Sequence, residues 1–442
     1  MPDVKTTTLS AVTANTPLNA PTGLSRAYTW AVFALTFGLM LSDYLSRQVI
    51  GAIFPALKAE WALSDSQLGM LVSVVSLAVG VLCVPISLVA DRWGRVKSIT
   101  LMAFVWCLAT IACGLAQSYG QLLLARMFVG LGEAAYGAAG AALLAHVFPA
   151  RQRAAVLGAF LSAGLFGSVL GVVVGGAVAA QAGWRMAFYA VGAPGLLLAF
   201  IYPFVVRDYK TVALSAEGQG DAAPARLRIG QIAREVFAAR SGNLTYVASG
   251  LQMAIPAILI AWLPTYLGRY QGMDVKQAGL MAGVAVLASG IGMIFGGGLA
   301  DRLSARHPRR RALVPAAYAV LSALVLIAAF ALPPGPLALS LIFLGALFAA
   351  AHGGCSGAIV CDVTHPGVRA TVTATIALAN NLIGLAPGPL LVGAFSDVLG
   401  LKLALTLAPV FALAAAVFFV LASRSYEADA ARHRTSGTQE PA

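Results

Sequence analysis

The chain has 442 residues, of which 59% are hydrophobic and only 10% are charged. A soluble globular protein carries about 25% charged residues, so this composition excludes an ordinary soluble domain and is typical of a membrane protein. The net charge of +12 does not indicate a nucleic-acid-binding protein, because the 29 Lys and Arg residues gather in alternate loops between apolar segments.

Apolar runs long enough to cross a bilayer predict twelve transmembrane helices and therefore an all-α membrane protein. The first half contains six of them, at 27–50, 66–90, 97–116, 121–146, 155–180 and 186–206. The second half contains the other six, at 243–268, 277–300, 312–331, 337–361, 371–395 and 401–422. We expect a disordered tail at 1–26, a six-helix bundle at 27–206, a linker at 207–241, a second six-helix bundle at 242–422 and a tail at 423–442.

The two halves repeat one another. The segment GVLCVPISLVADRWGRVKS at 80–98 has a degraded copy, GMIFGGGLADRLSARHPRR, at 292–310. Asp91-Arg92 matches Asp301-Arg302 at an offset of 210 residues, and each pair ends an apolar run and opens a short basic loop. Such a repeat predicts two pseudo-symmetric bundles, as in transporters whose halves rock about a central site.

The distribution of basic residues predicts the orientation. Twelve spans place both termini on one side, and the tails, linker and loops of that side hold 22 of the Lys and Arg residues. The opposite loops hold five, which are Lys58, Arg185, Arg269, Lys276 and Lys402. Because basic residues favour the cytoplasmic side, we expect a multi-pass protein of the cell (inner) membrane with both termini in the cytoplasm.

Glycines predict close helix contacts in two spans. Gly167, Gly171 and Gly175 repeat every four residues in the fifth span, and Gly384 and Gly388 do so in the eleventh. Ridges of small residues allow helix backbones to approach closely in lipid.

Motifs of soluble enzymes do not occur. The sequence has no P-loop, HExxH or GxSxG motif, and its five cysteines show no CxxC spacing. We therefore expect no catalytic residue, no metal and no cofactor. The remaining alternative to a transporter is a membrane sensor that has lost transport.

Four ionisable residues lie within the predicted spans of the first half. Asp43 and Arg47 are four residues apart in the first span, and Arg126 and Glu133 are seven apart in the fourth, so each pair shares a helix face. A charge inside a bilayer is costly unless it is paired or hydrated, which makes each of these residues a functional hypothesis. The four either form a neutral cluster that locks the spans together or take up protons as water access and ion pairing change.

The second half is almost free of charge within its spans. Its polar and aromatic candidates for substrate contact are Tyr246, Gln252, Trp262, Tyr266, His352, Asn380 and Asn381. The alternative for His352 is a packed, hydrogen-bonded core residue. One ionic and one mostly apolar wall suit an amphipathic molecule with a polar head.

Several motifs resemble one family. The loop Asp91–Lys97 resembles the signature loop of the major facilitator superfamily, and Arg126–Glu133 resembles its fourth-span motif. More narrowly, the stretches that look like spinster-type lipid transporters are 43–47, 55–61, 130–134, 369–371 and 381–389. Proton-coupled organic-anion symporters of the same superfamily also carry acidic residues in the first and fourth spans.

This resemblance implies the major facilitator fold, in which spans one and four line a central cavity. Asp43, with Glu133 as partner, would then couple transport to protons, and Arg47 and Arg126 would pair with them or bind a substrate head group. The implied partners are protons, membrane lipids and an amphipathic substrate such as a lysophospholipid, handled by a monomer. The alternative substrate is a small organic or sugar acid.

The resemblance also implies a cytoplasmic gate. It is formed by Asp91, Arg92 and Arg95 in the first half and by Asp301 and Arg302 in the second. An acidic side chain stabilises the N-terminus of a helix, so Asp91 would hold a helix end of the opposite half when the cavity faces outward.

Overall fold

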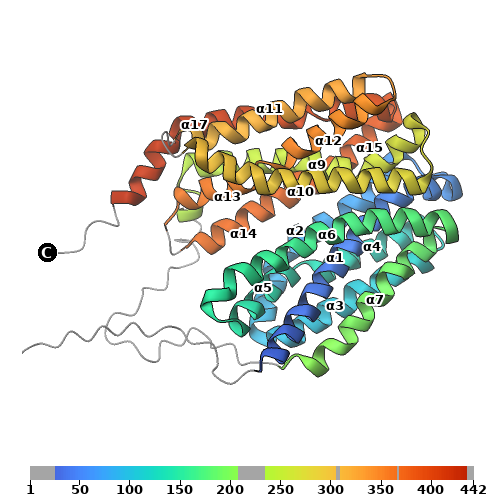
Figure 1. Ribbon diagram of the computed structural model, residues 1–442, viewed down its shortest axis with the longest axis horizontal. Coiled ribbons are helices and arrows are strands. Elements are labelled where there is room, and N and C mark those ends of the chain that lie inside the picture. The colour runs from blue at the N-terminus through green and yellow to red at the C-terminus, as the bar shows by residue number, and fades with distance from the viewer. Residues whose placement is uncertain (1–24, 208–233, 305–308, 366–367, 436–442) are drawn as a thin grey trace, which may run out of the picture.

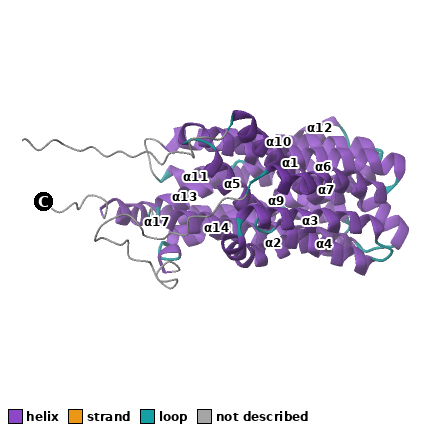
Figure 2. Cartoon of the chain, turned by 90° about the horizontal axis from the view of Figure 1, so that it is seen from below, coloured by secondary structure: helices purple, strands orange, loops and turns teal. Residues whose placement is uncertain are grey.

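The computed structural model describes residues 25–207, 234–304, 309–365 and 368–435, and the regular structure within these ranges is helical (Figure 2). Arg26, at the start of the first helix, and Thr435, at the end of the last, lie at the same end of the molecule (Figure 1). We call this end the terminal face and the opposite end the distal face. Most of the expected N-terminal tail and linker, and the last residues of the C-terminal tail, lie outside the described residues.

The first bundle holds the helices that precede the linker (Figure 1). They are α1 (Arg26–Trp61), α2 (Asp65–Trp93), α3 (Arg95–Leu115), α4 (Tyr119–Glu133), α5 (Tyr136–Val147), α6 (Ala150–Ala182) and α7 (Trp184–Val205).

The second bundle lies beside the first and holds the remaining helices (Figure 1). They are α9 (Arg240–Gln271), α10 (Val275–Ser304), α11 (Arg310–Ala331), α12 (Pro336–Ala350), α13 (Gly353–Asp362), α14 (Arg369–Ala379), the π-helix η2 (Asn380–Leu385), α15 (Pro387–Leu399), α16 (Leu401–Leu407) and α17 (Val410–Thr435).

Eleven segments of the described residues are long and apolar enough to cross a membrane, and each corresponds to one of the twelve predicted spans. The predicted span that is not among them is the first, which lies in α1. Polar side chains near the middle of α1, including Asp43 and Arg47, lower its hydropathy. At 36 residues α1 is about 54 Å long, which exceeds the thickness of a bilayer, and it packs against α6 and α7.

Two spans are interrupted at corresponding places in the two bundles. The fourth span breaks after Glu133, between α4 and α5, and the tenth breaks at His352, between α12 and α13. Close packing holds the first break, because a Cβ on Gly132 would lie 2.6 Å from the backbone nitrogen of Trp106 in α3. After the break, the hydroxyl of Tyr136 donates to the carbonyl of Thr36 at 2.6 Å.

The predicted close contacts of the glycine stripes are confirmed. A Cβ on Gly167 would lie 2.6 Å from the carbonyl oxygen of Leu41, and one on Gly171 would lie 2.9 Å from that of Leu45. The stripe of α6 therefore brings its backbone against α1, the helix that carries Asp43. In the eleventh span, a Cβ on Gly388 would lie 3.3 Å from Ala254 in α9.

Residues 423–435, which we expected in the C-terminal tail, continue α17 as a helix. Asp429 in this extension is buried and accepts hydrogen bonds from the backbone nitrogen and the hydroxyl of Ser241, at 2.8 and 2.7 Å. Because Ser241 lies in the first turn of α9, the carboxylate caps the start of that helix, where backbone N–H groups have no helical partner.

The glycine packing predicts a stability difference within one helix. Gly167→Val forces a side chain against the α1 backbone and should destabilise the protein by about 1–3 kcal/mol, as overpacking does. Gly158→Val in the same helix is the matched control, because a Cβ at that position meets nothing within 4 Å. Thermal unfolding of the purified protein in detergent measures both variants. Equal melting temperatures for the two would contradict close α1–α6 packing.

Candidate functional site

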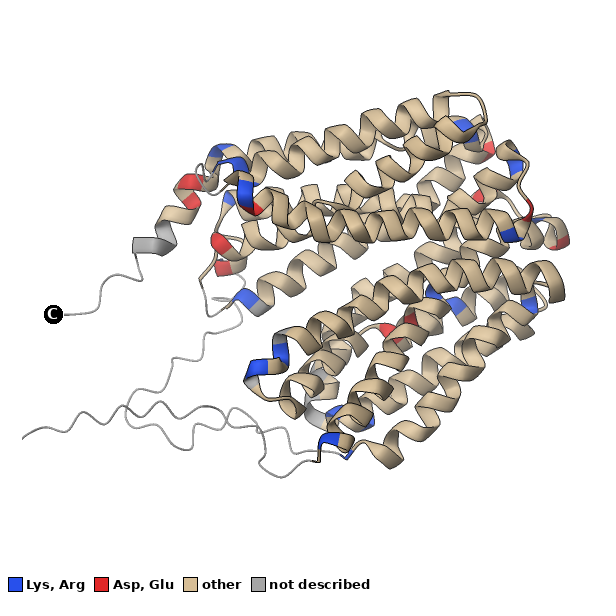
Figure 3. Ribbon diagram, viewed as in Figure 1, with Lys and Arg blue, Asp and Glu red and all other residues tan. Residues whose placement is uncertain are grey.

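The charged residues lie mostly at the two faces of the molecule, but a few lie in the middle of the first bundle (Figure 3). There the guanidinium of Arg47 lies 2.9 Å from a carboxylate oxygen of Glu133 and 3.9 Å from one of Asp43. The Glu133 side chain is fully buried and that of Asp43 nearly so, whereas the Arg47 side chain remains 17% exposed. We call Asp43, Arg47 and Glu133 the triad.

Helix geometry explains why the triad forms. Asp43 and Arg47 are one turn apart on α1, so their side chains lie on the same face. Glu133 is the last residue of α4, and the break that follows it ends the helix at this depth. The Arg47 guanidinium is thus near the carboxyl groups of both Asp43 and Glu133. Two acids and one arginine therefore share one buried place.

Hydrogen bonding within the triad is incomplete. One oxygen of Asp43, the Nε of Arg47 and the Oε1 of Glu133 are buried and accept or donate no hydrogen bond among the described residues. The neighbouring hydroxyls of Ser42 and Ser46 are in the same condition. Buried polar groups normally find partners, and a cluster of exceptions is typical of a functional site.

Arg126 is not part of these ion pairs. Its fully buried guanidinium donates to three backbone carbonyls, those of Leu71 at 3.1 Å, Ser46 at 3.0 Å and Arg47 at 3.2 Å. The planar fork of an arginine suits such a set of acceptors. Arg126 therefore ties α4 to α1 and α2.

The substrate-contact candidates of the second bundle do not form one cluster. Gln252 donates to Ser322 and to the carbonyl of Ala349, both at 3.2 Å, and Nδ1 of His352 lies 3.0 Å from the same carbonyl. Both side chains are fully buried. The Nε2 of His352 has no hydrogen-bond partner among the described residues.

The two asparagine candidates make hydrogen bonds within the second bundle. Asn380 accepts a hydrogen bond from Ser249 at 2.8 Å, and Asn381 donates to the carbonyl of Ala377 at 2.9 Å. Both asparagines lie in η2, and single turns of π-helix are frequent at functional sites.

The two aromatic candidates nearer the distal face serve packing. Trp262 donates to the carbonyl of Pro389 at 3.0 Å, and its ring lies 5.1 Å from that of Phe54 in the first bundle. Tyr266 packs on Phe330 with ring centroids 5.0 Å apart. Tyr246 is also buried, and its hydroxyl lies 3.4 Å from the carbonyl of Val236.

A second charged cluster, which the sequence analysis did not single out, joins the two bundles at the distal face. Asp65, the first residue of α2, accepts two hydrogen bonds from Arg269 of α9, both at 2.9 Å. Its carboxylate also accepts from Lys58 at 2.6 Å and from Ser396 of α15 at 2.5 Å. We call these four residues and Asp397 the distal lock.

Asp397 completes the distal lock from the other side. Its two carboxylate oxygens accept from the backbone nitrogens of Asp65 and Ser66, at 2.7 and 2.9 Å. An acid of α15 in the second bundle therefore caps the start of α2 in the first, in line with the preference of helix N-termini for negative charge. Other contacts between the bundles lie toward this face, and the ribbons diverge toward the terminal face (Figure 1).

Comparisons with known proteins place the chain in a family. The family model "Major Facilitator Superfamily" matches residues 36–387. The chain belongs to this superfamily. It is therefore a multi-pass membrane protein and a secondary transporter rather than an enzyme.

The resemblance to spinster-type transporters is confirmed by the relatives of this transporter. Protein spinster homolog 1 of Xenopus tropicalis is 25% identical over 393 residues, which cover 85% of this chain and 74% of that protein. A solved bacterial homologue of the human lysosomal transporter spinster, described as inward-facing and unoccupied, has the same fold. It matches with a TM-score of 0.84 and 23% identity, covering 92% of this chain and 99% of that one.

A relative of another kind is the probable L-galactonate transporter of Escherichia coli (strain K12). It is 28% identical over 289 residues, which cover 64% of this chain. The match spans 63% of that protein, so it covers less than two thirds of this relative's length.

The transporter's expected gate at the terminal face is only partly described. The side chains of Asp91 and Arg92 lie outside the described residues, and Arg95 begins α3 with its side chain partly buried. In the second bundle, Asp301 lies 3.6 Å from Arg311, which also pairs with Asp362 at 3.1 Å. The loop aspartate of the second half is thus paired within its own bundle.

The distal lock predicts a shift between conformations. Asp65→Asn removes the charge that Arg269 and Lys58 share, and removing one partner of a buried pair costs about 3–5 kcal/mol. Both basic partners are partly exposed, so we expect the lower end of that range. Even about 1.4 kcal/mol shifts a two-state population tenfold, here toward separation of the bundles at the distal face.

Spin labels at position 181, near the distal end of α6, and at position 334, in the loop after α11, report this separation as a longer distance. Glu60→Gln is the control, because the Glu60–Arg185 pair at 2.8 Å is exposed and lies within the first bundle. A distance distribution that stayed the same in Asp65→Asn would show that the distal lock does not hold the bundles.

Proposed function

We propose that this protein is a proton-coupled secondary transporter that moves an amphipathic, lysophospholipid-like anion by alternating access. The observation that carries the proposal is the triad, in which Asp43, Arg47 and Glu133 share one buried place in the first bundle. The described ion pairs of the second bundle lie toward the terminal and distal faces instead. We further propose that the terminal face is cytoplasmic, as the distribution of basic residues favours.

Proton coupling follows from the charge balance of the triad. Arg126 is satisfied by backbone carbonyls, so the triad holds two acids against one arginine. With both acids ionised, the guanidinium of Arg47 is 2.9 Å from Glu133 but 3.9 Å from Asp43, so among the described residues Asp43 lacks a close partner for its charge and is the acid that a proton would neutralise. Protonation of Asp43 leaves Arg47 to Glu133 alone and changes how α1 is held against α4.

A sodium ion fits the triad poorly. A hard cation prefers several oxygen ligands, and a guanidinium 2.9 Å from Glu133 competes for the same carboxylate. Protons need only the carboxylates themselves. This comparison supports protons as the coupling ion.

The asymmetry of the two bundles supports an amphipathic substrate. Arg47 is the exposed member of the triad and is therefore the cation that a head group can reach. The facing candidates of the second bundle are neutral, and their polar atoms are mostly engaged within that bundle. The resemblance to spinster-type lipid transporters, with similarity over 85% of the chain, also favours an amphipathic substrate.

A small organic or sugar acid is the second candidate. Similarity to the probable L-galactonate transporter favours it, and a lone carboxylate also pairs with an exposed arginine. The two candidates differ in whether an apolar tail contributes to binding.

The triad predicts the loss of a pH response. Asp43→Asn mimics the protonated acid, so the conformation should no longer depend on pH while the protein still folds. Glu133→Gln should give a weaker form of the same defect. Distances between labels on the two bundles, recorded across a pH series, measure the response.

Asp274→Asn is the matched control, because this exposed aspartate caps the start of α10 through Gln277 and asparagine caps equally well. If Asp43→Asn still switched with pH and still accumulated substrate against a gradient, Asp43 would serve packing and the coupling site would lie elsewhere.

The two substrate classes predict different results in a thermal-shift binding screen. Under the proposal, lysophospholipids raise the melting temperature of the wild-type protein. In Arg47→Gln the apparent affinity obtained from this rise should fall at least about fivefold, because a charged contact is lost. Galactonate-like carboxylates at the same concentration have no effect. Stabilisation by the small acids alone would reverse the order of the two candidates.

A further inference from the structure

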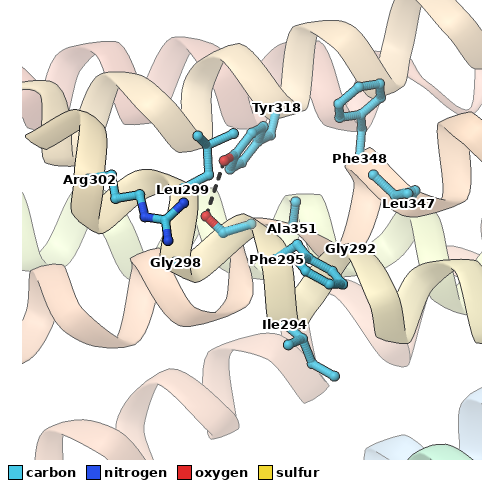
Figure 4. A pocket seen from close by; sticks show the side chains of 11 residues that line it. Gly292, Ile294, Phe295, Gly298, Leu299, Arg302, Tyr318, Leu347, Phe348 and Ala351 are labelled. Atoms are coloured by element: carbon cyan, nitrogen blue, oxygen red, sulfur yellow. Dashed lines mark hydrogen bonds between the residues drawn. The ribbon is translucent and has the colours of Figure 1, made fainter.

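An apolar groove runs along α10 where that helix meets α11 and α12, away from the triad. Its volume is about 430 Å³, and its lining residues include Phe295, Leu299, Leu347 and Phe348. The Phe295 side chain is among the most exposed large apolar groups of the second bundle, with 71% of the residue accessible. Figure 4 shows these side chains along the groove, with Arg302 at one end and Leu347 and Phe348 toward the other.

Small residues form the floor of the groove. Gly292 and Gly296 bring α10 against α12, because a Cβ on Gly296 would lie 2.6 Å from the carbonyl oxygen of Ala351 and one on Gly292 would clash with Leu347. The hydroxyl of Tyr318 in α11 donates to the carbonyl of Gly296 at 3.1 Å and fixes the third helix. A Cβ on Gly298 meets nothing within 4 Å, so the groove is open above it.

A single cation lies at one end of this apolar surface. Arg302 is in the last turn of α10 and lines the groove. Its neighbour Asp301 pairs with Arg311, and among the described residues Arg302 has no ion pair. Arg302 was expected in the cytoplasmic gate, and the structure shows that it also lines this groove within the second bundle.

The dimensions match those of a lipid. Ten residues separate Gly292 from Arg302, which corresponds to about 15 Å along the helix. Arg302 lies toward the terminal face, where the hydrocarbon of a bilayer gives way to lipid phosphates. An apolar track that ends on a cation with no ion pair among the described residues is complementary to an acyl chain that ends on an anionic head group.

We propose that this groove binds an anionic phospholipid from the leaflet at the terminal face, with its phosphate on Arg302 and one acyl chain along Phe295, Leu299 and Phe348. The site is separate from the triad and does not depend on which substrate is transported. Its occupant contacts α10, α11 and α12 together. Binding therefore stabilises their packing in the second bundle.

Native mass spectrometry of the full-length protein with dioleoyl-phosphatidylglycerol or dioleoyl-phosphatidylcholine tests the proposal. We expect wild type to retain the anionic lipid preferentially. Arg302→Gln should lower that affinity about fivefold, in line with one basic contact to an anionic lipid, and should leave the zwitterionic lipid unchanged. Glycerol phosphate, which has the head group without the chains, should not compete.

A second variant tests the acyl track. Gly298→Leu fills the groove without a backbone clash and should weaken retention of both lipids. The controls are Arg310→Gln, an exposed arginine that does not line the groove, and Gly158→Leu, an equally unobstructed glycine on α6. The proposal is overturned if Arg310→Gln lowers retention as much as Arg302→Gln, if Gly298→Leu has no effect, or if glycerol phosphate competes.

Discussion

Three hydrogen bonds from one buried arginine fix the part of the first bundle on which its chemistry depends. Arg126 donates to carbonyls at positions 46, 47 and 71, each of which belongs to a helix. A carbonyl has two lone pairs, so it accepts this bond and keeps its helical one. Inside a membrane no water replaces these contacts, and a full positive charge without them costs several kcal/mol. Because two of the three acceptors flank the start of the Arg47 side chain, the same contacts set where that guanidinium meets Glu133.

The distal lock gives the two bundles a discrete arrangement. Asp65 and Asp397 come from different bundles, and the carboxylate of each accepts hydrogen bonds across the interface. Asp65 accepts from the side chain of Arg269, and Asp397 accepts from the backbone at the start of α2. Such a network is either assembled or broken, because its members lose most of their hydrogen bonds together once the bundles move apart. A ligand or a proton can shift the population of conformations only where the protein has two distinct states, and an assembled and a broken distal lock are two such states. Two residues of the triad, Asp43 and Arg47, lie on α1, and Lys58 in the last turn of the same helix belongs to the distal lock.

Features that depend on local spacing were predictable from the sequence. Apolar runs predicted the spans, and four-residue glycine spacing predicted a close helix contact of the fifth span, though not its partner α1. The spacing of Asp43 and Arg47 predicted one side of the triad. The distal lock was not predictable in this way. Asp65 follows Ser64 in a capping box and therefore reads as a helix start, and Arg269 lies 204 residues away. Spacing also cannot show which acceptor an arginine finds, so Arg126 was grouped with Glu133 on its own helix face.

The internal repeat explains why the two bundles share one architecture, but not why their buried polar residues differ. Both bundles break a helix at the same place, and each break carries a titratable residue, Glu133 in one and His352 in the other. Glu133 meets a cation from a neighbouring helix, whereas His352 is fully buried beside a backbone carbonyl that Gln252 also uses. Through this shared carbonyl, Gln252 ties α9 to the break between α12 and α13. Under the proposed proton coupling, the second bundle is the surface against which the first changes its ion pairs. On that proposal the proton acts on the ion pairs of one bundle, although both bundles share one scaffold.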